Sequence, residues 1–135
     1  MSSLATSSFD WQHYLELANE LNGSASLTCD NQAVLRTCVS RAYYAAFHVA
    51  RSFAIQCRPR FEFELKNNKK SVHDSVLGEF FNKGDSKHEI YVLLNRLRQE
   101  RNAADYVPNV NIGKEVAEND ILDAEAVVDR ISNMP

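Results

Sequence analysis

The segment NQAVLRTCVSRAYYAAFHVARSFAIQ, residues 31–56, decides the fold predicted for this chain of 135 residues. Its apolar side chains recur every three or four residues, which is the spacing of one face of an α-helix. The main apolar stripe consists of Leu35, Cys38, Ala42, Ala45, Val49 and Phe53. A second set widens this stripe on one side and consists of Tyr43, Phe47, Ala50 and Ala54. Because most of its circumference is apolar, this helix is predicted to lie at the centre of a helical bundle.

The remaining polar face of this helix carries Arg41, Tyr44, His48 and Arg51, which are spaced three, four and three residues apart and therefore stack on one side. Two guanidiniums, an imidazole and a phenol form a surface that can contact phosphate. Two interpretations of His48 are open. It is a hydrogen-bonded structural histidine, or it is a base that the charge of the two arginines keeps neutral.

A second segment, RNAADY at residues 101–106, ends another predicted helix that begins at about Lys87. Its helical spacing places Arg101 on the apolar face with leucines, although a guanidinium is costly to bury without a partner. In one interpretation Arg101 forms a structural pair with Asp105, one turn further on, with Arg98 flanking the same face. In the other it lines a water-filled cleft and meets an anionic ligand with its planar fork.

Three further helices are predicted, over residues 9–22, 71–82 and 114–131. Asp30 is predicted as the N-cap of the long helix. Residues 61–70 are interpreted as a basic loop, although Phe61, Phe63 and Leu65 alternate with acidic residues as in a short strand. The sequence thus predicts one all-α domain over residues 1–135, an antiparallel up-and-down bundle of about five helices.

The composition, with 44% hydrophobic and 24% charged residues and a net charge of -3, is that of a soluble domain. No apolar run approaches a membrane span and residues 1–8 lack the apolar region of a signal peptide, so a cytoplasmic location is expected. The three cysteines show no C-x-x-C spacing, and neither a metal-binding motif nor a glycine-rich phosphate loop is present. Any catalysis is therefore expected to use Arg, Tyr, His and Asp, without a metal or cofactor.

Charge is distributed unevenly along the chain. Residues 31–61 contain no acidic residue but five arginines, and Lys66, Lys69 and Lys70 follow soon after. The part after Gly113 is strongly acidic. A basic region suits an anionic ligand, and a solvated charged face is the alternative.

Two stretches, SRAYYAAFHVA at residues 40–50 and R-x-x-RNAADY at residues 98–106, resemble the higher eukaryotes and prokaryotes nucleotide-binding (HEPN) family, in its small prokaryotic branch. The resemblance implies an up-and-down bundle and a homodimer in which the motifs of the fourth helix face each other across a cleft. Many HEPN proteins are metal-independent endoribonucleases, which act as toxins paired with a nucleotidyltransferase antitoxin or in phage defence.

The resemblance also implies roles for individual residues. Arg101 matches the family arginine that binds the scissile phosphate, and Asn102 matches the polar residue after it. Tyr106 stands where the family has a histidine, and no histidine follows it. A phenol is a poor base at neutral pH, so His48 is the better candidate to activate a 2′-hydroxyl.

Two functions are therefore expected. The first is an RNA endonuclease with Arg101, Tyr106 and His48 as catalytic residues. The second is a non-catalytic accessory subunit that binds RNA, a nucleotide or a partner protein. In both, the residues expected to contact RNA or nucleotide are Arg41, Tyr44, Arg51, Arg98, Asn102 and Asp105.

Overall fold

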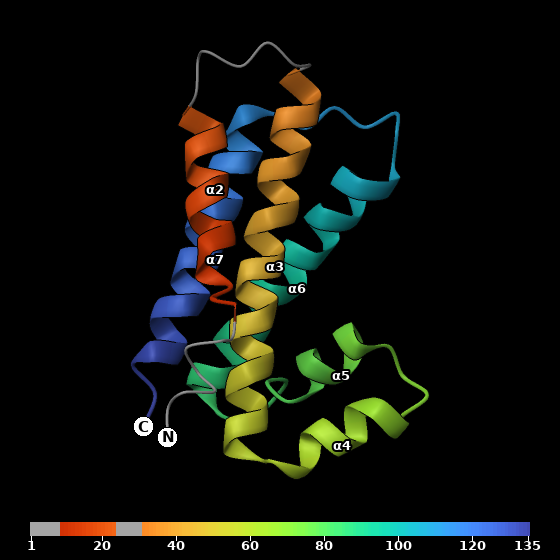
Figure 1. Ribbon diagram of the computed structural model, residues 1–135, viewed down its shortest axis with the longest axis vertical. Helices are drawn as coiled ribbons and strands as arrows, with labels where there is room; N and C mark the ends of the chain where they lie inside the picture. The colour runs from red at the N-terminus through yellow and green to blue at the C-terminus, as the bar shows by residue number, and fades with distance from the viewer. Residues whose placement is uncertain (1–8, 24–30) are drawn as a thin grey trace.

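The computed structural model describes residues 9–23 and 31–135, and all of the regular secondary structure in these ranges is helical (Figure 1). The helices are α2 (Gln12–Gly23), α3 (Asn31–Cys57), α4 (Arg60–Asn67), α5 (Val72–Gly78), α6 (Asp85–Tyr106) and α7 (Lys114–Ser132). The prediction of an all-α fold is confirmed. None of these helices is long and apolar enough to cross a lipid bilayer.

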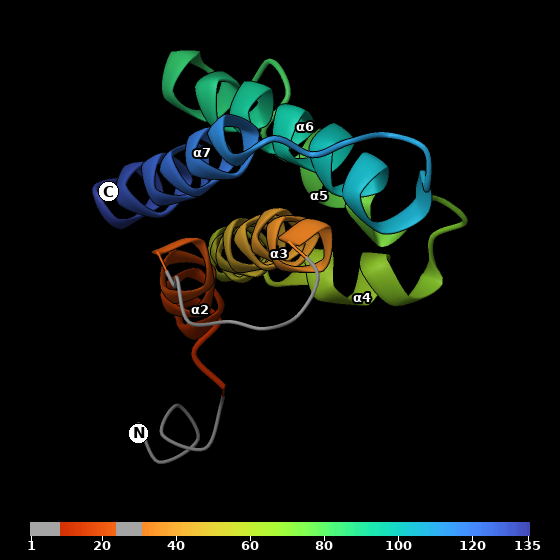
Figure 2. The same cartoon turned by 90° about the horizontal axis from the view of Figure 1, so that it is seen from above.

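Helix α3 is the centre of the bundle, as its apolar circumference predicts. It packs against α2, α6 and α7, which are arranged around it (Figure 2). Five alanines of α3 are buried, and their small side chains allow neighbouring helices to approach closely. They are Ala42, Ala45, Ala46, Ala50 and Ala54. Larger side chains of the same helix, such as Tyr43 and Phe47, fill the space between these contacts.

The prediction of a loop over residues 61–70 is wrong, because Arg60–Asn67 forms helix α4 and raises the described helices from five to six. Phe61 and Leu65 are one helical turn apart and turn inward, whereas Phe63 is 62% exposed. The alternation of Phe61, Phe63 and Leu65 with acidic residues thus suggested a strand, whereas the spacing of Phe61 and Leu65 is that of a helix. Arg58 ties this helix to the bundle, since it donates hydrogen bonds to the carboxylates of Glu64 and Glu79.

Two other boundaries differ from the predicted ones. Helix α5 begins after Ser71, whose hydroxyl accepts a hydrogen bond from the amide of Asp74, and ends at Gly78 rather than near residue 82. Helix α6 begins at Asp85, directly after Gly84, which has a φ of 101°. That left-handed conformation favours glycine and turns the chain into the helix. The predicted N-cap Asp30 lies outside the described residues.

The C-terminal end of α6 is held against α3 by Arg36. Its guanidinium donates hydrogen bonds to the backbone carbonyls of Ala103, Ala104, Val107 and Val110. These include carbonyls at the end of a helix, which have no partner within the helix. One turn earlier on α3, Gln32 exchanges two hydrogen bonds with the backbone of Ile112. Arg36 therefore has a structural role. It holds in place the end of α6, where residues 101–106 lie.

Candidate functional site

Arg101 lies on the apolar face of α6, as predicted, and is only 4% exposed. Its guanidinium carbon is 5.0, 5.4 and 5.6 Å from the ring centroids of Tyr43, Tyr44 and Tyr106. A cation over aromatic faces is stabilised by the ring quadrupoles, more so when it is removed from water. We call Arg41, Tyr43, Tyr44, Arg101 and Tyr106 the arginine–tyrosine cluster.

Asp105 compensates the charge of Arg101 only in part. Its Oδ2 is 3.9 Å from Nη1 of Arg101, which is too long for a hydrogen bond, and instead accepts one from the Ser40 hydroxyl at 3.3 Å. Nε of Arg101 is buried and has no hydrogen-bond partner among the described residues. The predicted pair of Arg101 and Asp105 is therefore only a long, weak contact. The alternative prediction, a water-filled cleft around Arg101, is wrong for the single chain, because the protein itself surrounds the guanidinium.

Arg41 is the second cation of the cluster. Its guanidinium carbon is 4.5 Å from the ring centroid of Tyr14 on α2 and 5.1 Å from that of Tyr44. It donates a hydrogen bond to the Ser40 hydroxyl at 3.2 Å. No carboxylate of the described chain lies within salt-bridge distance of Arg41. Arg41 thus carries a half-buried positive charge that has no carboxylate partner within residues 9–23 and 31–135, and it lies between two phenol rings.

Arg98, Asn102 and Arg51 have different surroundings from Arg41. Arg98 is held by Asp74 at 2.5 Å, so its charge is already balanced. Asn102 is exposed on α6 beside the buried Arg101. Arg51 is half-buried on α3, where its charge contributes to lowering the pKa of His48. The α3 positions predicted from helical spacing thus share a face, but only Arg41 and Tyr44 join the cluster.

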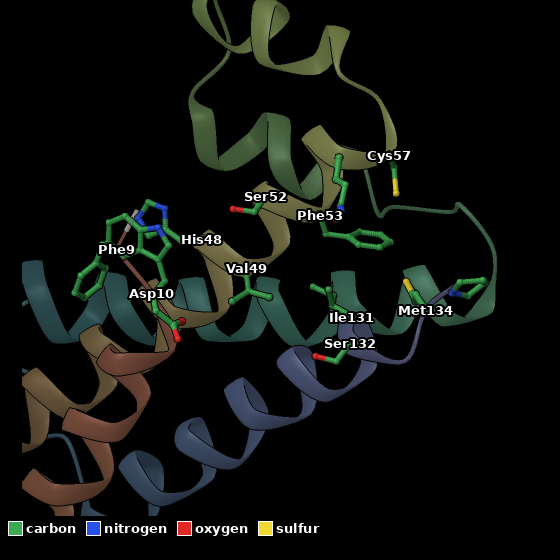
Figure 3. A pocket seen from close by; sticks show the side chains of 13 residues that line it. Phe9, Asp10, His48, Val49, Ser52, Phe53, Cys57, Ile131, Ser132 and Met134 are labelled. Carbon is green, nitrogen blue, oxygen red and sulfur yellow. The ribbon is translucent and has the colours of Figure 1, made fainter. Parts of the chain in front are cut away.

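The structure separates His48 from Arg101. The imidazole stacks on Trp11, with ring centroids 3.6 Å apart, and lines a cavity of about 710 Å³ between α3 and the end of α7. Figure 3 shows His48 beside Phe9 at one end of this cavity, with Cys57 and Met134 at the other. Its closest link to Arg101 is Tyr44, whose ring centroid is 6.1 Å from that of His48.

Burial, followed by the charges of Arg51 and His73, lowers the pKa of His48 to about 4. The imidazole is therefore neutral at pH 7, and burial rather than arginine charge is the main cause. Its stacking on Trp11 fits the structural interpretation of this residue.

His73 on α5 joins the site although no sequence pattern predicted it. Its Nδ1 is 2.5 Å from the hydroxyl of Tyr43, and its ring packs against Phe47 with centroids 4.7 Å apart. Burial and then the charges of Arg101 and Arg98 lower the pKa of His73, whereas burial raises the pKa of Tyr43. The pair is therefore a neutral imidazole and a protonated phenol beside Arg101. In the sequence, His73 is one of four dispersed histidines, and its spacing from Arg101 gives no signal.

The described residues contain no group of three or more His, Cys, Asp or Glu side chains arranged to hold a metal ion. The chemistry that the arrangement offers is thus that of cations, aromatic rings and neutral imidazoles. Comparisons of the chain with protein-family models, with curated proteins and with solved structures find no significant match.

Proposed function

We propose that this protein binds single-stranded RNA, as a HEPN-like helical domain, through the arginine–tyrosine cluster of α3 and α6. The observation that carries the proposal is Arg41, a cation without a carboxylate partner in the described chain, held between the rings of Tyr14 and Tyr44. Proteins bind single strands by pairing cations with phosphates and stacking bases on aromatic rings. The resemblance of residues 40–50 and 98–106 to the HEPN family supports the same ligand.

The neighbouring groups have complementary roles in this proposal. Tyr106 is 69% exposed at the end of α6 and offers a ring on which a base can stack. Arg101 beneath it adds positive potential from a site of low dielectric constant, where charge is weakly screened. Binding rather than cleavage fits this geometry best, because Arg101 is buried and His48 is engaged with Trp11.

Replacing Arg41 with alanine is expected to weaken RNA binding about tenfold, since a charge-assisted contact to phosphate is worth roughly 1.4 kcal/mol or more. The slope of log affinity against log salt concentration should also fall by about 0.7 for each lost phosphate contact with a single strand. Fluorescence anisotropy of a labelled oligouridine measures both quantities.

The matched control is Arg60→Ala, because the side chain of Arg60 is 80% exposed on α4 and lies outside the cluster. It removes the same charge from the protein and should change affinity much less. Equal losses in the two variants would show that binding depends on net charge alone, and the proposal would then be wrong.

A metal-independent endoribonuclease is the second candidate, and the observation that favours it is His73, which is hydrogen-bonded to the hydroxyl of Tyr43, the ring over which Arg101 lies. In that reaction Nε2 of a neutral His73 would accept the proton of the 2′-hydroxyl as this oxygen attacks the phosphorus. The 5′-oxygen would leave and take up a proton from water, and Arg101 would stabilise the charge that develops on the phosphoryl oxygens. The products would be a 2′,3′-cyclic phosphate and a 5′-hydroxyl.

For this candidate, we expect wild-type protein to cleave RNA in the presence of EDTA and His73→Ala to lose activity by about a hundredfold or more, the usual contribution of a general base. His48→Ala should retain most of the activity. The opposite pattern would assign the base to His48. Wild-type protein that binds RNA without cleaving it would eliminate the nuclease and leave the binding function in place.

A further inference from the structure

An acidic cavity lies between α6 and α7 and shares no residue with the arginine–tyrosine cluster. Its volume is about 370 Å³, and its lining consists of Arg96, Glu100, Val116, Asn119, Asp120, Leu122 and Asp123. Asp120 is only 3% exposed, and its Oδ2 has no hydrogen-bond partner among the described residues. A buried carboxylate oxygen without a donor is costly, so this arrangement lacks a group that would complete it.

The charges around Asp120 do not supply that group. Glu100 on α6 and Asp123 on α7 are both negative, and burial together with these two carboxylates raises the pKa of Asp120 to about 7. Arg96 on α6 is the cation that lines the cavity and acts on Asp120. Its Nε is already bound to Oδ2 of Asp123 at 2.9 Å, and its side chain is 53% exposed. The cavity therefore holds an excess of negative charge.

The described side chains do not form a metal site here, since no three carboxylates of that part of the chain converge on one point. An organic cation fits better, because a guanidinium or ammonium group donates several hydrogen bonds to carboxylates that are spread around it. Val116 and Leu122 line the same cavity and can cover an alkyl stem, and Leu122 is 61% exposed at its rim. The volume lies within the usual range of ligand pockets, about 300–1,000 Å³.

We propose that this cavity is a binding site for an organic cation, a guanidinium or primary ammonium group that donates hydrogen bonds to Asp120 and lies against Glu100. The cation would come from a small amine or from a basic side chain of a partner polypeptide. Its chemistry is opposite to that of the arginine–tyrosine cluster, so the site does not depend on the proposed RNA binding.

The test is isothermal titration calorimetry of the full chain at neutral pH with methylguanidinium, n-butylammonium and the blocked peptide acetyl-Gly-Arg-Gly-amide. Each titration is run in two buffers that differ in ionisation enthalpy. We expect saturable binding with proton release, because a bound cation favours the ionised form of Asp120. Asp120→Asn should abolish both signals, and Glu100→Gln should weaken binding about tenfold, as expected for loss of one charge-assisted contact.

The control is Glu118→Gln, which removes an exposed carboxylate of α7 outside the cavity and should leave binding unchanged. If the peptide binds at least tenfold more tightly than methylguanidinium, the proposal is supported and the natural cation is a basic side chain of a polypeptide. If the peptide and methylguanidinium bind with equal affinity, the proposal is supported and the natural cation is a small amine. Absence of binding by all three probes, or unaltered binding in both Asp120→Asn and Glu100→Gln, would overturn the proposal.

Discussion

Replacing Arg36 with alanine is expected to lower the free energy of unfolding by about 3–5 kcal/mol, because a hydrogen bond to a charged group contributes roughly 1.5–3 kcal/mol and several are lost together. The change leaves the carbonyls of Ala103, Ala104, Val107 and Val110 without their donor. Water can replace part of the loss, since Arg36 is only half-buried, and this keeps the expected cost below the full sum.

Thermal unfolding followed by circular dichroism should show a melting temperature lower by about 10 °C or more. Arg36→Lys should give an intermediate value, because an ammonium reaches fewer carbonyls than a planar guanidinium fork. Thr37→Ala is the control, as it alters the next residue on α3 and removes only a local hydrogen bond to the Ala33 carbonyl. A shift for Arg36→Ala no larger than that of the control would contradict the role of Arg36 in holding the end of α6.

Replacing Arg101 with methionine is expected to leave the protein at least as stable as the wild type, while its affinity for RNA falls about tenfold, because the positive potential that the buried guanidinium adds at the cluster is lost. Methionine keeps apolar contact with the rings of Tyr43, Tyr44 and Tyr106 and removes a buried guanidinium whose Nε is unpaired. Exchanging a buried ion for an apolar group of similar volume is commonly neutral or stabilising by about 1–4 kcal/mol. Asp105 remains partly solvated and keeps its hydrogen bond from Ser40.

Arg101→Ala should behave differently from Arg101→Met, because it opens a cavity beneath the rings and should cost about 2–4 kcal/mol, as large-to-small changes in a core do. A water-filled cleft around Arg101, the alternative interpretation from the sequence, would instead leave the alanine variant nearly as stable as the wild type. Melting and RNA anisotropy of both variants distinguish the two roles. If Arg101→Met were strongly destabilised and its folded fraction bound RNA normally, Arg101 would be a structural residue.

The parts of the fold that depend on local spacing could be predicted from the sequence. The long helix was expected over residues 31–56 and is observed over Asn31–Cys57, because its apolar pattern is continuous and uninterrupted by glycine or proline. Helix α4 could not be predicted this way. Its apolar residues fit both a two-residue and a four-residue period, and only the structure shows that Phe61 and Leu65 pack together against the core.

The same distinction between local spacing and long-range packing applies to the site. Arg41 and Tyr44 share a face because they are three residues apart on one helix, and Arg101 lies on the apolar face of α6, as its spacing predicts. His73 and Tyr14 reach the site from other helices, and only the packing of α5 and α2 against α3 brings them there. Helical spacing alone is also insufficient for His48, because its ring stacks on Trp11, which lies directly before α2.

The proposed binding of RNA at the arginine–tyrosine cluster can be tested by titrating an oligouridine into isotopically labelled protein and mapping the changes in the amide spectrum. We expect the largest shifts to arise from residues 41–48 of α3 and 101–106 of α6, and we expect Arg41→Ala to reduce them at equal RNA concentration. Shifts confined to the lysine-rich segment at residues 66–70, with none in the cluster, would contradict it.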